Sequence, residues 1–262
     1  MLLKDKVVIV SGIGPGLGIE LAKLAAAEGA ILAIAARTAR KLDETEQQIA
    51  ALGLNTRVLK VATDISSKEQ CASLVAQTIA AYGRIDVLIN SAYNPGSFEP
   101  IEHANLDSWR QAMDVNLFGT MNLTLDVVAQ MKKQGGGSIV MVNTMVTRKP
   151  LATQGGYGAS KAALSSATAH LATELGAYNI RVNSTYMGWM WGAPVQGYIN
   201  AMADHTGQSV DTLVAEIEKN IPLGKIPTDA DCAKAVMFLA SDYACAVTGA
   251  ALDVNGGEYI PH

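Results

Sequence analysis

The feature that most constrains the fold is a regular alternation of short β-branched runs with longer stretches rich in alanine and leucine. The strand-like runs lie near residues 6–11, 30–36, 56–61, 86–90, 137–143, 180–185 and 250–254. The helix-like stretches lie near residues 16–28, 39–52, 67–82, 108–133, 155–177 and 229–240. Strand, helix and strand in repetition favour parallel pairing through right-handed crossovers. We therefore expect an α/β fold with three layers, in which helices cover both faces of a seven-stranded, mainly parallel sheet.

Composition supports one domain over residues 1–262. Hydrophobic residues make up 49% of the 262 residues and aromatic residues only 5%, so aliphatic side chains must build the core. A parallel sheet buried on both faces needs this balance. The segment at about 188–227 breaks the alternation and contains a further helix-like stretch, Val210 to Lys219. Long insertions of this kind often carry function, and we expect this one to cover a substrate.

Charge and composition exclude several classes of partner. The net charge is -4 and no run of lysine or arginine occurs, which argues against nucleic acid. No apolar stretch is long enough to cross a membrane. The three cysteines form no CxxC pair and the four histidines lack metal-site spacing, so we expect neither a disulfide framework nor a metal. The sequence predicts a cytoplasmic protein.

A glycine cluster follows the first expected strand and precedes the first expected helix. It reads Ser11-Gly-Ile-Gly-Pro-Gly-Leu-Gly18, with Gly12, Gly16 and Gly18 in the spacing GxxxGxG. Glycines let the backbone approach a pyrophosphate, and the N-terminus of the next helix favours its charge. In isolation the cluster is equally typical of a flexible turn, but its place between strand and helix favours a dinucleotide site.

The end of the second expected strand indicates which dinucleotide binds. An acidic residue there would accept a hydrogen bond from the 2′-hydroxyl of NAD, but the chain has Ala36, followed by Arg37 and Thr38. Arg37 can form charge-assisted hydrogen bonds to a 2′-phosphate. The sequence thus predicts a preference for NADP(H), the alternative being that Arg37 is an ordinary solvated arginine.

Tyr157 and Lys161 lie one helical turn apart in the stretch Tyr157-Gly-Ala-Ser-Lys161. Residues at this spacing share a helix face. A neighbouring ammonium should lower the phenol's pKa, which lets the pair exchange a proton with a substrate oxygen. Such a pair also arises by chance in a chain of this length, so its weight depends on the motifs around it.

With these motifs the chain resembles the short-chain dehydrogenase/reductase family from Lys6 to about Tyr259. The resemblance implies a Rossmann-type fold and assigns cofactor contacts to Ser11, Gly12, Gly14, Gly16, Leu17, Gly18, Arg37, Thr38, Asp64, Ile65, Asn90, Ser91, Ala92, Tyr157, Lys161, Met187 and Gly188. It also implies an adenine contact for Asp64 and four catalytic residues, namely Asn116, Thr144, Tyr157 and Lys161. Asn116 matches an asparagine that distorts its helix. Each of three residues also has a purely structural alternative. Asn116 could cap a turn, Asp64 could form a strand-ending turn or a helix cap, and Thr144 could simply end a strand.

The chain departs from the family pattern at a few positions. Thr144 stands where the family has serine, and it keeps the hydroxyl while adding a methyl group. Met187 replaces the proline of a Pro-Gly pair, and Tyr93 replaces a glycine. We place Tyr93, Met145, Trp189 and Trp191 in the substrate pocket. Arg148 and Lys149 offer an anion contact, although adjacent cations on a loop are more often solvated.

The expected activity is an NADP(H)-dependent interconversion of a secondary alcohol and a ketone, with an apolar, bulky or cyclic substrate under the insertion. Related enoyl reductases carry a tyrosine seven residues before the lysine, where this chain has Gln154. This favours carbonyl chemistry. The alternative is a dinucleotide-binding redox sensor or scaffold without turnover. By resemblance we expect a homotetramer that packs through Leu164 to Leu175.

Overall fold

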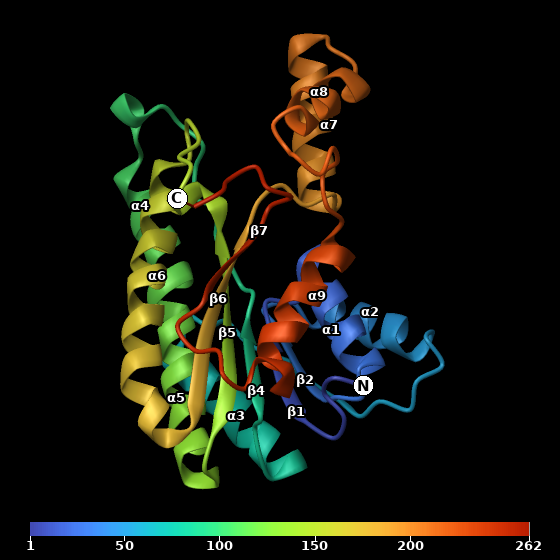
Figure 1. Ribbon diagram of the computed structural model, residues 1–262, viewed down its shortest axis with the longest axis vertical. Coiled ribbons are helices and arrows are strands. Elements are labelled where there is room, and N and C mark those ends of the chain that lie inside the picture. Colours follow the sequence, from blue (N-terminus) through green and yellow to red (C-terminus); the bar gives the residue numbers. More distant parts are fainter. Residues whose placement is uncertain (262) are drawn as a thin grey trace.

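A seven-stranded sheet forms the centre of the computed structural model, which describes residues 1–261 (Figure 1). The strand order is β3-β2-β1-β4-β5-β6-β7, and every neighbouring pair is parallel. The expected fold class is confirmed. The strands are β1 Val7–Ser11, β2 Ile31–Ala36, β3 Val58–Ala62, β4 Val87–Asn90, β5 Gly137–Thr144, β6 Ile180–Met187 and β7 Ala251–Val254.

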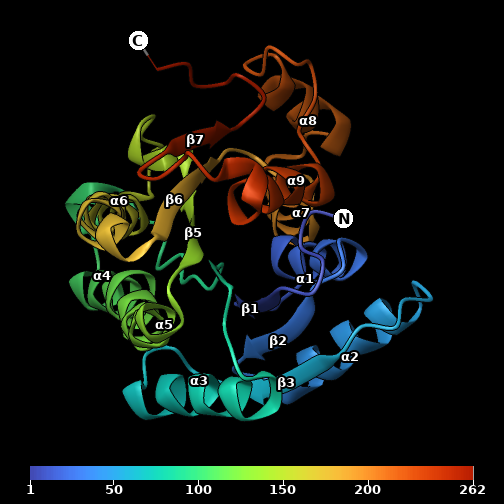
Figure 2. The ribbon, with the colours of Figure 1, turned by 60° about the horizontal axis from the view of Figure 1, so that its bottom comes forward.

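Helices cover both faces of the sheet, and the two views agree on the layers (Figure 2). One apolar cluster joins β1 and β2 to α1, α2 and α9, and the other joins the opposite face to α3, α5 and α6. The helices are α1 Leu17–Ala27, α2 Ala39–Ala50, α3 Lys68–Tyr82, α4 Leu106–Met113, α5 Thr120–Gln134, α6 Gly155–Leu175, α7 Ala193–Thr206, α8 Val210–Glu218 and α9 Asp229–Ala240. No helix of the described residues is long and apolar enough to cross a membrane.

The aliphatic composition explains this core. Every residue of β1 and β4 is buried, because helices cover both faces and leave no solvent side for polar residues. Helix starts are fixed locally. For example, the Ser67 side chain accepts a hydrogen bond from the Gln70 backbone at the start of α3.

The topology brings the functional motifs to one edge. The chain runs outward from β1 through β2 to β3, then crosses to β4 on the other side of β1. A crevice for ligands forms where strand order reverses in this way. Ser11 of β1 lies opposite Asn90 of β4, and Asn90 lies opposite Met141 of β5. The carboxyl ends of these strands, and the loops that follow them, therefore lie side by side.

Two stretches differ in detail from the sequence prediction. The single helix expected over 108–133 is interrupted by a π-helical segment, Asp114–Gly119, between α4 and α5. Its hydrogen bonds are displaced by one residue, since the backbone N–H of Thr120 donates to the carbonyl of Val115, five residues earlier. The expected insertion forms two helices, α7 and α8, which project beyond the sheet at the top of Figure 1.

Candidate functional site

A cleft of about 560 Å³ opens at the carboxyl edge of β1, β2, β4 and β5. Its walls come from the loops after these strands, from the start of α6 and from the segment between β6 and α7. Most of the expected site residues line it, namely Gly12, Gly14, Leu17, Gly18, Arg37, Thr38, Asp64, Ile65, Ser91, Ala92, Tyr93, Thr144, Tyr157, Lys161, Met187 and Gly188.

The glycine loop is packed too tightly for side chains. Gly12 has φ of +90°, and a Cβ there would stand 2.2 Å from the backbone nitrogen of Ala92. A Cβ on Gly18 would stand 2.3 Å from the carbonyl oxygen of Gly12. The two glycines let β1 turn directly into α1 and leave the helix N-terminus facing the cleft. This geometry fits the pyrophosphate of a dinucleotide.

Two cations lie where β2 ends. Arg37 is exposed and lines the cleft, and Lys41 joins it from the first turns of α2. The Lys41 ammonium lies within 3.9 Å of the position a Cβ on Gly14 would take. Sequence reasoning missed Lys41, although its spacing of four from Arg37 was a usable signal. Asp64, across the cleft mouth, accepts hydrogen bonds from the backbone and hydroxyl of Ser66, and these hold the pKa of its carboxyl below the usual value.

The α6 helix presents Tyr157 and Lys161 to the cleft from successive turns. The first turn of α6 packs closely on α4. A Cβ on Gly156 would stand only 2.6 Å from the Trp109 ring, so this position has no room for a side chain. Lys161 is 2% exposed, and its ammonium donates to the carbonyl of Val142 at 2.8 Å. The expected pair therefore lies on one face of the helix, beside the end of β5.

The end of β5 is fixed to the same helix. The Asn143 side chain donates to the Lys161 carbonyl at 3.2 Å and to the Ser165 hydroxyl at 2.8 Å. Its own oxygen accepts from the backbone of Thr144. Thr144, the next residue, is therefore held at the cleft wall, where its hydroxyl also accepts from the Val146 backbone at 3.3 Å.

Asn116 links three segments behind the cleft. It is fully buried within the π-helical segment, and its side chain both accepts from the backbone nitrogen of Asn94 and donates to the Asn94 carbonyl. The same amide donates to the hydroxyl of Ser160, which in turn donates to the Tyr157 carbonyl. Asn116 thus braces the loop after β4 and the first turn of α6. Its side chain does not line the cleft.

Burial dominates the acid–base properties of the pair. It raises the pKa of the Tyr157 phenol, the neighbouring Tyr93 adds to the rise, and a hydrogen bond with Thr144 partly offsets it. Burial also lowers the pKa of Lys161 to about 8. The sequence-based expectation that the ammonium lowers the phenol's pKa is therefore wrong for the protein without ligand. The Tyr157 phenol is therefore neutral at neutral pH.

The expected substrate residues fall in different places. Tyr93 packs edge-on against Tyr157, with ring centroids 6.3 Å apart. Trp189 packs on Tyr198 of α7, whereas Trp191 lies in a smaller cavity beside the cleft. Met145 is buried and does not line the cleft. The insertion reaches the cleft through other residues, Met190, Pro194 and Val195.

Ser11 and Asn90 also lie behind the lining. Both are buried at the ends of β1 and β4, and the Ser11 hydroxyl and the side-chain oxygen Oδ1 of Asn90 have no hydrogen-bond partner among the described residues. Arg148 and Lys149 were the candidates for binding an anionic group of a ligand, but both side chains already pair with carboxylates of the chain itself. Arg148 pairs with Asp253 and Lys149 with Glu258, which ties the loop after β5 to the C-terminal segment.

Comparison with known proteins finds similarity to oxidoreductases over nearly the whole chain. Residues 12–258 match a family model described as "Enoyl-(Acyl carrier protein) reductase". A peroxisomal 2,4-dienoyl-CoA reductase of Danio rerio is 30% identical, over 99% of this chain and 83% of that protein. L-Sorbose reductase of Gluconobacter frateurii, solved with NADPH and L-sorbose, superposes with a TM-score of 0.93, 26% identity and full coverage of both chains. An NAD⁺-bound xylitol dehydrogenase superposes with a TM-score of 0.91 and 26% identity, over 98% of this chain and 100% of that one.

The buried ammonium predicts a pH dependence of stability. Unfolding returns the Lys161 pKa from about 8 to its ordinary 10.5, so the unfolded chain binds more protons between these values and stability rises with pH. Relative to Lys161→Met, the wild type should gain about 2 kcal/mol of unfolding free energy between pH 8 and 10. Urea unfolding at both pH values measures this, with the exposed Lys133→Met as control. A constant difference between wild type and Lys161→Met would contradict the burial of a charged Lys161.

Proposed function

Because the chain belongs to the short-chain dehydrogenase/reductase family of oxidoreductases, we propose that it interconverts a secondary alcohol and a ketone with NADP(H). One observation carries this proposal. Tyr157, Thr144 and Lys161 line the same cleft as the glycine loop. Acid–base groups and a dinucleotide-binding turn are needed together only where hydride and proton move in one reaction.

The cleft offers a place for each part of a dinucleotide. The glycine loop would hold the pyrophosphate, Asp64 and Ile65 the adenine end, and Lys161 the nicotinamide ribose. When bound, the nicotinamide supplies or accepts the hydride. Met187 and Gly188 lie at the end of β6, where they would border the nicotinamide.

The chain's own residues provide the proton. Tyr157 remains protonated at neutral pH because burial raises its pKa, so its hydroxyl can donate to a ketone oxygen. Thr144, held at the end of β5, can hydrogen-bond the same oxygen. Lys161 keeps a positive charge below about pH 8, which favours the phenolate that proton transfer leaves behind.

The substrate part of the cleft is mainly apolar, which supports an apolar, bulky or cyclic substrate. Met190, Pro194 and Val195 of the insertion line it together with Tyr93 and Val115. Gln154, at the first-turn position where enoyl reductases carry a tyrosine, supports carbonyl over carbon–carbon double-bond reduction. Because the chain is similar to a dienoyl-CoA reductase, enones are the alternative substrate class that a substrate screen should include.

Removal of one hydroxyl tests the chemistry. Tyr157→Phe should lower kcat for ketone reduction by about 10²- to 10⁴-fold, because it deletes the proton donor. NADPH binding, followed by quenching of protein fluorescence, should be preserved. A panel of cyclic and long-chain ketones, alcohols and enones, followed by absorbance of the reduced nicotinamide, identifies the substrate. If wild type and variant bind NADPH but neither turns over any compound, the protein is a binder and the proposed activity is wrong.

Substitution of two cationic residues, Arg37 and Lys41, tests the preference for NADP(H) over NAD(H). Arg37 and Lys41 would both contact the 2′-phosphate, so Arg37→Ala and Lys41→Ala should each raise the Kd of NADPH by about tenfold or more. The Kd of NADH should hardly change. Arg40→Ala is the control, because Arg40 is exposed and pairs with Glu44. A wild-type protein that binds NADH more tightly than NADPH would refute the assignment.

We also propose a homotetramer that packs through α5 and α6. Phe118 and Leu125 lie seven residues apart and are 58% and 54% exposed, while the outer face of α6 carries small residues such as Ala162 and Ala169. Light scattering should give four times the protomer mass of 27.5 kDa. Leu125→Glu should reduce this mass, whereas Leu52→Glu on the opposite side of the sheet should not. A wild-type mass of one protomer would contradict the proposal.

A further inference from the structure

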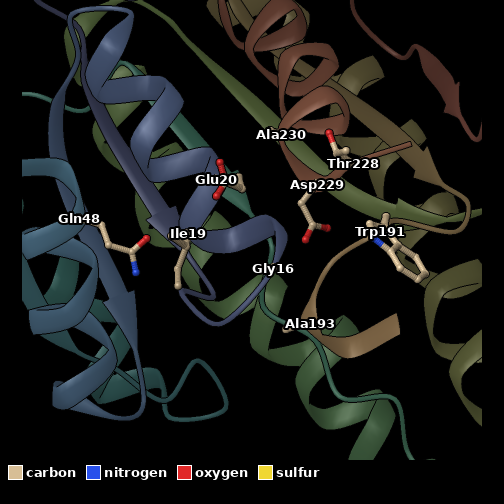
Figure 3. Close-up of a pocket in the computed structure, with 9 residues that line it drawn as sticks. All are labelled: Gly16, Ile19, Glu20, Gln48, Trp191, Ala193, Thr228, Asp229 and Ala230. Carbon is tan, nitrogen blue, oxygen red and sulfur yellow. The ribbon is translucent and has the colours of Figure 1, made fainter. Parts of the chain in front are cut away.

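Asp229 is a buried carboxylate at the boundary between the glycine loop and the insertion. It is 7% exposed, and its side chain points from the start of α9 into the space between Gly16 and Trp191 (Figure 3). It lines both the main cleft and the smaller cavity of about 370 Å³ beside it. Asp229 therefore lies beside Gly16, the N-cap residue of α1.

Two glycines make room for this carboxylate. A Cβ on Gly192 would stand 1.6 Å from the Asp229 oxygen Oδ2, so any larger residue at position 192 would displace the side chain. A Cβ on Gly16 would stand 3.3 Å from the same oxygen. Asp229 thus contacts the phosphate loop and the start of α7 together.

The carboxylate has no partner of its own. Within residues 1–261, neither a hydrogen-bond donor nor a cation is among the groups that shift the pKa of its carboxyl, and Asp229 lines the two cavities. Asp231, two residues later, differs in this respect because it bonds to Thr228 and Lys234. A carboxyl that the protein itself leaves without a hydrogen-bond partner, and that faces a cavity, is free to bond with a ligand there.

The charges around Asp229 are unfavourable for its ionised form. Burial raises the pKa of Asp229, and Glu20 on α1 adds to the rise. Tyr93, after β4, and Cys232, on α9 itself, are the other titratable groups that it influences, and neither is a cation. The lysine nearest to Glu20, Lys23, is already paired with Glu20. The segment 190–195 on the remaining side contains no charged residue.

We propose that Asp229 contacts the dinucleotide's pyrophosphate as the neutral acid, so that cofactor binding takes up a proton at this side chain. The inference rests on the dinucleotide site of the proposed function. An ionised carboxylate beside the pyrophosphate would repel it, whereas the protonated form donates one O–H···O⁻ hydrogen bond. The proton comes from solvent, and no bond other than this O–H forms or breaks. Asp229 thereby makes cofactor affinity sensitive to pH.

Cofactor binding as a function of pH tests this directly. The Kd values of NADPH and NADH are measured by fluorescence between pH 5.5 and 8.5 in EDTA, for wild type, Asp229→Asn and the control Asp231→Asn. Wild type and Asp231→Asn should bind more weakly as pH rises, by up to tenfold per pH unit. Asp229→Asn keeps a donor without the titration, so it should lack this slope between pH 5.5 and 7.5, below the pKa of about 8 at which Lys161 loses its proton in every variant. At pH 7.5 it should bind about tenfold more tightly than wild type. Because NADH has no 2′-phosphate, the same slope with both cofactors assigns it to the protein.

Calorimetry supplies a second readout. Titration of NADH in buffers of different ionisation enthalpy should report proton uptake by wild type and none by Asp229→Asn. Equal slopes and equal uptake in both proteins would overturn the proposal and leave the oxidoreductase function intact. Tightening of wild-type binding at pH 8.5 by Mg²⁺, absent in Asp229→Asn, would also overturn it, because a cation would then bridge the two anions. If no protein binds either dinucleotide, the proposed function fails and this inference fails with it.

Discussion

The parallel order of the sheet is the constraint on which the site depends. With all strands parallel and the order reversing beside β1, the carboxyl ends of β1, β2, β4 and β5 must meet at one edge. The glycine loop, Arg37, Ser91 and Thr144 come from four separate parts of the sequence, yet each directly follows or ends one of these strands. The topology of the sheet brings these residues together in one cleft. The sequence has only to provide side chains of the right chemistry at the strand ends.

Much of the fold could be predicted because its signals are local and repeat. The strand cores are aliphatic on both faces, and helix starts such as Ser67 carry ordinary caps. The π-helical segment could not be derived from periodicity, since the residues around Asn116 have ordinary helical spacing. The segment instead coincides with a long-range contact, the double hydrogen bond of the Asn116 side chain to the backbone of Asn94. Only the resemblance indicated a distortion there.

The site shows a similar division. Residues named from spaced motifs, such as Tyr157, Lys161 and Thr144, come together in the cleft. The placing of aromatic residues in the insertion was less successful, since composition cannot say which way Trp189 and Trp191 face. The pKa of Tyr157 illustrates the same limit. Sequence spacing indicates a nearby cation, but the direction of the shift depends on how deeply the phenol is buried, and burial dominates here.

Asp229 extends this reasoning to a residue that belongs to no motif. Its significance depends on Gly192, which lies far away in the sequence and leaves the space that the carboxylate fills. Gly192 has no side chain that could donate to the cofactor, and a protonated Asp229, which occupies the space beside it, supplies a donor at the same place. A carboxyl group donates only in its neutral form, so cofactor binding through Asp229 depends on pH. A hydroxyl group in the same place would donate at any pH near neutral. The cost of a buried acid is then offset when the pyrophosphate arrives, because the ligand supplies the acceptor that the protein lacks.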